Sequence, residues 1–191
     1  MERRDLLKMI VAATGAALVG LPALASGQAP VAGAKTAFSE ADIGTLDEIA
    51  ETILPRTKTP GAKDAGAGAF MARFVTDCYT AQQQAAFHAG LADIEKRAGG
   101  RFVALAPKAR NELLRTLDAQ ARKRATEVSE TGTAEGGEAT PHYFTMIKQL
   151  AIFGFFTSKV GATETLQYVA VPGRYDGDLA YVPGTPAWGT S

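Results

Sequence analysis

The sequence predicts an all-α protein: a single domain of about five helices that ends in an irregular C-terminal arm. Apolar residues recur every three to four positions in several segments, as on one face of a helix. Proline, glycine and capping residues separate these segments. No segment alternates apolar and polar residues for long enough to build a sheet. With 191 residues, of which 46% are hydrophobic, the chain can bury the core of one domain.

The N-terminus reads as an export signal. Arg3 and Arg4 precede an uncharged run over residues 9–21, which is shorter than the about 20 apolar residues that span a bilayer. The run leads to the small-residue motif Ala-Leu-Ala that ends at Ala25. This order predicts a twin-arginine signal over residues 1–25, cleaved after Ala25. The alternative, an amphipathic first helix of a cytosolic domain, is disfavoured because the run contains two glycines and has no polar face.

Charge and cysteine content limit the function classes. Residues 1–25 hold three of the 20 basic and two of the 20 acidic residues, so the remaining chain has 17 basic and 18 acidic residues. A nearly neutral chain argues against nucleic-acid binding and does not support a polybasic lipid anchor. Cys78 is the only cysteine, which excludes an internal disulfide. Pairing with another chain and burial are the alternatives, and burial is favoured because Phe74 lies one helical turn away.

The predicted elements follow a flexible arm over residues 26–37, and the domain extends over residues 38–191. Helices are expected over residues 39–54, 69–79, 82–98, 107–125 and 141–155, with a shorter helical piece over residues 162–168. Residues 55–68 form a loop rich in proline, glycine and threonine. Residues 126–139 are acidic and contain glycine, which predicts a mobile loop or a frayed helix end. From about residue 169 to 191 the arm is too rich in proline and glycine for a long helix or a central strand.

Local signals place the helix ends. Ser39 and Asp42 have the spacing of a capping box at the first helix. Asp64 is predicted to cap the second helix, and Thr140 the fifth. Gly154 would let another backbone approach the fifth helix closely.

The sequence contains no recognisable catalytic or metal-binding motif. His88 and His142 are the only histidines, and neither has a second histidine at ligand spacing, which favours structural roles for both. The glycine-rich loop lacks the order of a phosphate-binding loop, and no nucleophile elbow or haem-attachment motif is present. We therefore predict no catalytic, cofactor-binding or metal-binding residue in this chain.

Two stretches carry a family resemblance: "ETILPRTKTPGAKDAGAGAFMARFV", residues 51–75, and "FGFFTSKVGATETLQYVAVPGRYDG", residues 153–177. Together they resemble the gluconate 2-dehydrogenase subunit 3 family, the small or gamma subunits of bacterial flavin-dependent sugar and sugar-acid dehydrogenases. The similarity covers nearly all of the chain after the signal. Many members carry a cysteine shortly after the motif that reads "PGRYDG" here, whereas this chain has Asp178 and Leu179. This departure disfavours a covalent link to a partner through the arm.

The resemblance implies a function through partners. FAD and the catalytic groups belong to a large subunit of the GMC type, and a cytochrome c subunit with haem is often a third component. The small subunit carries the twin-arginine signal and acts as an escort, or chaperone, that stabilises the folded large subunit during shared export to the periplasm. Membrane association at the periplasmic face of the inner membrane would come only through the complex or an uncleaved signal.

The two stretches also suggest where a partner binds. Rigid loops, aromatic residues and arginines are enriched at interface hot spots, and the candidates here are Arg56, Pro60, Phe156, Tyr168, Arg174, Tyr175 and Trp188. For the loop at residues 55–68, closing the domain's own core is an equal alternative. For the arm, an interface is favoured because little would hold it locally.

Two other functions stay open from the sequence. One is an independent periplasmic binding or scaffold protein. The other is a stand-alone enzyme that uses carboxylates or His142 in a helical pocket.

Overall fold

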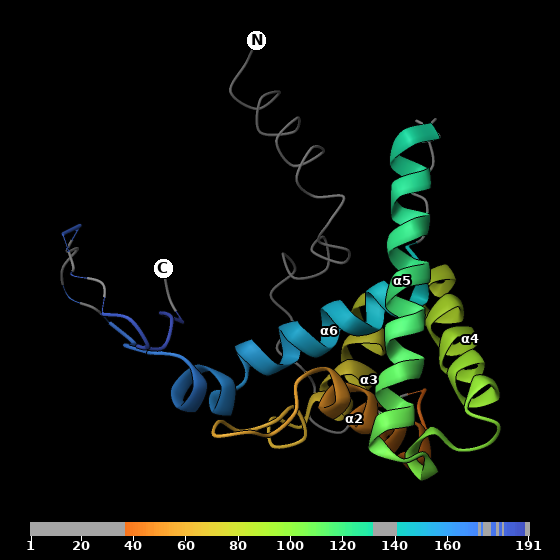
Figure 1. Ribbon diagram of the computed structural model, residues 1–191, viewed down its shortest axis with the longest axis horizontal. Coiled ribbons are helices and arrows are strands. Elements are labelled where there is room, and N and C mark those ends of the chain that lie inside the picture. Colours follow the sequence, from red (N-terminus) through yellow and green to blue (C-terminus); the bar gives the residue numbers. More distant parts are fainter. Residues whose placement is uncertain are drawn as a thin grey trace.

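The computed structural model describes residues 37–131 and 141–189, without residues 172, 174–176, 179 and 181 and without the side chains of residues 128–131. The predicted signal, with Arg3, Arg4 and Ala25, and nearly all of the predicted flexible arm lie outside this description. Figure 1 draws the described part as a coloured ribbon.

The all-α prediction is confirmed. The described residues form five α-helices and two short helical turns: α2 (Glu40–Ile53), α3 (Ala67–Cys78), α4 (Ala81–Arg97), η2 (Phe102–Ala104), α5 (Pro107–Thr131), α6 (Tyr143–Thr157) and η3 (Gly161–Thr165). The only strand-like pairing among them is an isolated parallel bridge between Gln167 and Trp188. No described helix has both the length and the apolar run that crossing a membrane would need.

The first helix begins as the sequence predicts. The Ser39 hydroxyl accepts a hydrogen bond from the Asp42 N–H, and the Asp42 carboxylate accepts one from the Ser39 N–H. The start of α4 repeats this capping box with Thr80 and Gln83. Both boxes satisfy N–H groups that the first turn of a helix leaves without partners.

The predicted caps of two other helices are wrong. The N-cap of α3 is Gly66, in the left-handed conformation at φ 63°, which glycine adopts without steric cost. Asp64 instead organises the preceding loop, where its carboxylate accepts a hydrogen bond from the Gly61 N–H. The N-cap of α6 is His142, whose Nδ1 accepts a hydrogen bond from the Phe144 N–H at 3.2 Å. Thr140 lies outside the described residues.

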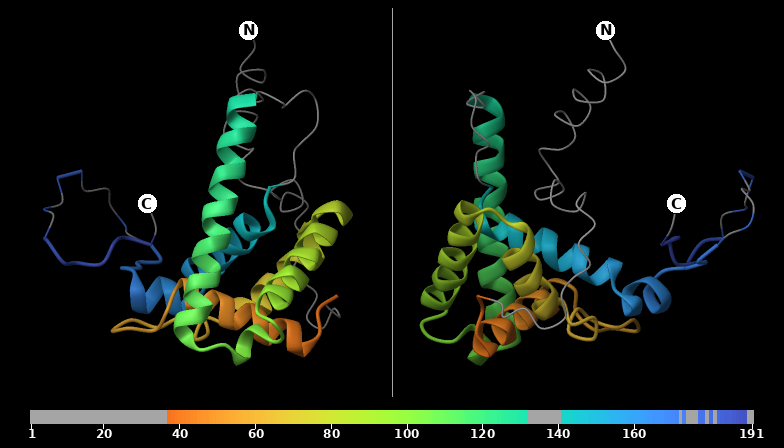
Figure 2. Two further views of the ribbon diagram at one scale, coloured as in Figure 1. Left: turned by 45° about the vertical axis from the view of Figure 1, so that its right-hand side comes forward. Right: turned by 180° about the vertical axis from the view of Figure 1, so that it is seen from behind.

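Helix α5 is longer than predicted. It runs to Thr131, into the segment expected as a loop or frayed end, and residues 132–140 lie outside the described part. Figures 1 and 2 show its second half projecting beyond the other helices. Exposed i,i+4 pairs along α5, such as Arg122 with Asp118 and Lys123 with Glu127, favour the helix there.

Helix α6 lies at the centre of the domain and contacts α2, α3, α4 and α5. Its inner face buries Phe144, Met146, Ile147, Leu150 and Ala151. From the other helices and η2, the largest fully buried side chains are Leu46, Ile49, Met71, Val75, Phe87, Ile94, Phe102 and Leu117. The core therefore forms around α6.

Two details at the end of α6 differ from expectation. Gly154 faces the aromatic ring of Phe70, and not a backbone as predicted. The helical piece expected over residues 162–168 is the five-residue π-turn η3 at Gly161–Thr165, after which Gln167 is extended and pairs with Trp188.

Candidate partner-binding surface

The exposed apolar surface is concentrated at one end of the protein. All large apolar side chains that are exposed among the described residues lie between Ile152 and Trp188; they are Ile152, Phe153, Phe156, Tyr168, Val169, Val171, Val182 and Trp188. Scattered apolar residues are normal on a surface, but a contiguous apolar region marks a binding site. This distribution selects α6 and the arm as the candidate surface.

The outer face of α6 changes character along the helix. Thr145 and Gln149 occupy it in the first half, and Ile152, Phe153 and Phe156 in the second. We call these last three residues the α6 patch. Phe153 and Phe156 are 42% and 37% exposed, although seven other residues of the same helix are buried. A helix that is apolar on its outer face as well is typical of a segment that another molecule covers.

The α6 patch continues onto α3. The ring of Phe153 lies 5.7 Å from that of Phe70 and 5.9 Å from that of Phe74, measured between centroids. Phe70 and Phe74 are half-buried and lie 5.7 Å from each other. Such tilted and edge-on contacts are favourable, so the patch rests on a rigid aromatic base.

The loop between α2 and α3 is held at its base. The Glu51 carboxylate accepts hydrogen bonds from the Arg56 N–H at 2.8 Å and from the Lys63 N–H at 3.0 Å. The Ala62 N–H donates to the Leu54 carbonyl, and Ala62 is fully buried. The base of the loop therefore closes the domain's core, as one of the two alternatives proposed.

The tip of the same loop is free to meet a partner. Residues 55–59 are exposed and Pro60 is half-buried. Arg56, a predicted interface residue, is held by an ion pair with Asp64, whose other oxygen accepts the Gly61 N–H. Because these bonds fix the tip before any partner arrives, binding there would cost little conformational entropy.

The arm folds back on its own start and is held at Gln167, just after η3. The Gln167 N–H donates to the Ala187 carbonyl, and the Gly189 N–H donates to the Gln167 carbonyl, both at 2.8 Å. The Gln167 side-chain amide donates to the Pro186 carbonyl at 2.9 Å. Tyr168 and Trp188, both predicted interface residues, are 46% and 48% exposed beside this junction. Arg174 and Tyr175 lie outside the described residues.

The loop, the end of α6 and the arm share one end of the molecule. In Figure 1 and in both views of Figure 2, the loop between α2 and α3 lies beside the C-terminal end of α6 and η3, and the arm extends from there away from the helical body. The structure thus brings together the two stretches that suggested a family. Of the predicted interface residues, Arg56, Pro60, Phe156, Tyr168 and Trp188 lie at this end.

Sequence reasoning missed the centre of this surface. Ile152 and Phe153 were not among the predicted residues, nor were Phe70 and Phe74. A signal was present, because residues 150–156 read Leu-Ala-Ile-Phe-Gly-Phe-Phe, which is apolar around the whole helix. Such a run exceeds what one buried face requires.

The two histidines have structural contacts. The ring of His88 stacks on Phe38 with 4.2 Å between centroids, and Phe38 is buried against Phe87. His142 caps α6 and stacks on Tyr143 at 4.4 Å. Burial lowers the pKa of His142, and the nearby Arg124 and Arg97 lower it further.

Cys78 is half-buried, and not fully buried as the sequence suggested. Burial, together with the charge of Asp77, raises the pKa of its thiol, so the reactive thiolate form is disfavoured. Within residues 37–131 and 141–189, as far as they are described, no three His, Cys, Asp or Glu side chains gather in an arrangement that could hold a metal ion.

Comparison with known families agrees with this geometry. The family model described as gluconate 2-dehydrogenase subunit 3 matches residues 40–173. The chain belongs to this family. The match begins at the first residue of α2 and includes the loop, α6 and η3. Most of the candidate partner-binding surface of this subunit 3 protein therefore lies within the matched residues. No curated protein and no solved structure showed significant similarity to the chain. Subunit 3 belongs to a dehydrogenase complex, which implies other dehydrogenase subunits as partners.

Proposed function

We propose that this protein is the non-catalytic small subunit of a periplasmic, FAD-dependent gluconate or sugar dehydrogenase. It escorts the large flavoprotein subunit through twin-arginine export, for which Arg3 and Arg4 supply the signal, and stabilises it afterwards. FAD is carried by the large subunit, which is of the GMC type, and a cytochrome c subunit with haem would be a further partner.

One observation carries the proposal: among the described residues, the exposed large apolar side chains lie on the second half of α6 and on the arm, at the end where the loop, α6 and the arm meet. A folded protein that is exported alone gains nothing from leaving Phe153, Phe156 and Trp188 in water. A subunit that binds a second protein needs such side chains, because buried aromatic residues dominate the affinity of protein interfaces. Membership in a dehydrogenase-subunit family supplies the class of partner.

Copurification tests the proposal. The chain and the large flavoprotein subunit are coexpressed, and the affinity tag is on the chain. Ile152→Ser with Phe156→Ser is expected to weaken the complex at least about 30-fold, since each truncation removes part of a hot spot. The matched control is Gln149→Ser, on the polar half of the same helical face, which should leave the complex intact.

The free energy of unfolding of the isolated variants separates binding from folding. Ile152 and Phe156 are only 38% and 37% exposed, so each truncation should lower the free energy of unfolding by about 1–2 kcal/mol while the chain stays folded. For the exposed Gln149→Ser the change should stay within about 0.5 kcal/mol. If the large subunit copurifies equally with the double variant and with the control, the α6 patch is not the binding surface.

A further inference from the structure

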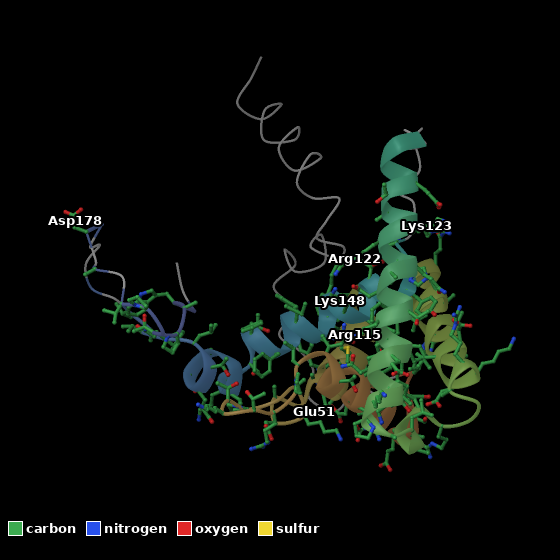
Figure 3. The ribbon with its side chains drawn as sticks, viewed as in Figure 1. Glu51, Arg115, Arg122, Lys123, Lys148 and Asp178 are labelled. Carbon is green, nitrogen blue, oxygen red and sulfur yellow. The ribbon has the colours of Figure 1, made fainter. Side chains whose placement is uncertain are left out.

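A groove lined by basic side chains lies where α5 and α6 meet. It has a volume of about 310 Å³. Arg115, Arg122 and Lys148 contribute its charged walls, and Ile53, Leu114 and Phe144 its apolar floor. We call it the basic groove. Figure 3 shows Arg115, Arg122 and Lys148 along the junction of α5 with α6, while Lys123 points from another side of α5.

Positive charge in this groove is only partly compensated. Lys148 Nζ donates to Asp118 Oδ1 at 2.7 Å, and Arg122 donates to Asp118 Oδ2 at 2.8 Å, so two cations share one carboxylate. Arg115 Nε donates at 2.6 Å to the amide oxygen of Asn111, which carries no charge. Asp118 is the only acidic residue that lines the groove. The balance is three cations to one anion, in a chain whose basic and acidic totals are equal.

These bonds hold the cations in place, and the single carboxylate leaves the groove with a net charge of +2. The hydrogen bond from Lys148, and then Arg122, keeps the pKa of Asp118 below its ordinary value, so Asp118 stays ionised and continues to orient both groups. Two fixed cations above an apolar floor match a carboxylate that is attached to an apolar chain.

The basic groove adjoins the α6 patch. Lys148 lies four residues before Ile152 on α6, and residues at this spacing are neighbours on a helix surface. A partner segment that covers Ile152 would therefore extend towards Lys148 and Arg115. A flat anionic membrane fits this place less well, because the cations line a depression between helices.

We infer that the basic groove binds a carboxylate-bearing segment of the same flavoprotein subunit that covers the α6 patch. The inference rests on the proposed function, because it names the chemistry of that partner next to the apolar contact. The apolar patch would supply most of the affinity, and the groove would select a partner with acidic residues at the matching place and speed their encounter.

Binding kinetics with the purified flavoprotein subunit test this inference. In Arg115→Gln, a side-chain amide replaces the charged group beside Asn111. We expect association to slow and affinity to fall about fivefold to tenfold at low salt. The difference should shrink in about 0.5 M NaCl, where the Debye length is only a few ångströms. The matched control is Lys123→Gln, which also removes one cation from α5 but lies outside the groove and should change affinity less than about twofold.

The outcomes separate the two proposals. The inference is wrong if Arg115→Gln and Lys123→Gln change the affinity equally. It is also wrong if Arg115→Gln has no effect, and the proposed function stands if Ile152→Ser with Phe156→Ser still weakens binding. If Arg115→Gln loses binding to phosphatidylglycerol vesicles but keeps its binding to the flavoprotein subunit, the groove binds a lipid surface. The inference is then wrong as well. A wild-type chain that binds no flavoprotein subunit contradicts both.

Discussion

Gly154 of α6 lies against the ring of Phe70 on α3, so closely that a Cβ at position 154 would come within 2.5 Å of the Phe70 Cδ1. The ring cannot move aside freely, because it also packs against Phe74 and Phe153. This contact sets the distance between α3 and α6 directly beneath the α6 patch. The geometry of the binding surface therefore depends on the close approach of α3 and α6.

Gly154→Ala is expected to destabilise the domain by about 1–3 kcal/mol, the usual cost of overpacking, reduced by alanine's better helix propensity. Chemical denaturation of the purified chain measures the change. Gly44→Ala is the matched control, because Gly44 lies within α2 and has no atom within 4 Å of its Cβ position. It should stabilise the protein by up to about 1 kcal/mol. Equal effects of the two substitutions would show that the contact with Phe70 is unimportant.

Tyr143 and Asp93 predict a pH effect. The Tyr143 hydroxyl donates to Asp93 Oδ2 at 2.5 Å, and Arg97 Nε donates to the same oxygen at 2.6 Å. The bond from Tyr143, and then Arg97, lowers the pKa of Asp93 below its ordinary value of 3.8. The unfolded state therefore binds this proton more readily, so the stability that Asp93 contributes is present above pH 3.8 and is lost as pH falls through the lowered pKa.

Tyr143→Phe should thus be less stable than the wild type by about 1 kcal/mol at neutral pH. The difference in the free energy of unfolding should narrow when urea unfolding is repeated at about pH 3. Protonation of Asp93 then removes from the wild type the stabilisation that the variant already lacks. Tyr79→Phe serves as the control, since burial, and not a carboxylate, is the main cause that raises the pKa of Tyr79 to about 12. A gap for Tyr143→Phe that stays constant with pH would contradict the role of Asp93.

Glu51 should control the rigidity of the loop between α2 and α3. Glu51→Ala removes the acceptor of the Arg56 and Lys63 N–H groups. Hydrogen bonds to a charged group contribute about 1.5–3 kcal/mol, so hydrogen exchange over residues 56–63 should accelerate about tenfold or more. Glu40→Ala, in the first turn of the same helix, should not change exchange in the loop. Protection of the loop that survives Glu51→Ala would place its anchor elsewhere.

Sequence patterns predicted the parts of the fold that depend on local chemistry. The box of Ser39 and Asp42 gave the start of α2, and Pro107 gave the start of α5, because both act within one helical turn. His142 was missed as a cap because its role depends on which ring nitrogen faces the Phe144 N–H. Asp64 has a typical capping residue type, but its position in the folded loop turns it towards Gly61.

The binding surface was only partly predictable. Loop and arm residues such as Arg56 and Trp188 stand out by type and by their place in the family stretches. The exposure of Phe153 depends on which face of α6 the other helices leave uncovered, and this is decided by packing between distant segments. The basic groove was hidden for the same reason, since Arg115 and Lys148 lie more than 30 positions apart and the total charge of the chain is zero.

The distribution of the large flavoprotein subunit between cytoplasm and periplasm tests the central claim most directly. It is coexpressed with the wild-type chain or with the variant Arg3→Lys, Arg4→Lys, and FAD-dependent activity and protein are measured in both fractions. The account predicts that both chains reach the periplasm with the wild type and that both stay in the cytoplasm with the variant. Arrival of the large subunit in the periplasm beside the variant would contradict shared export.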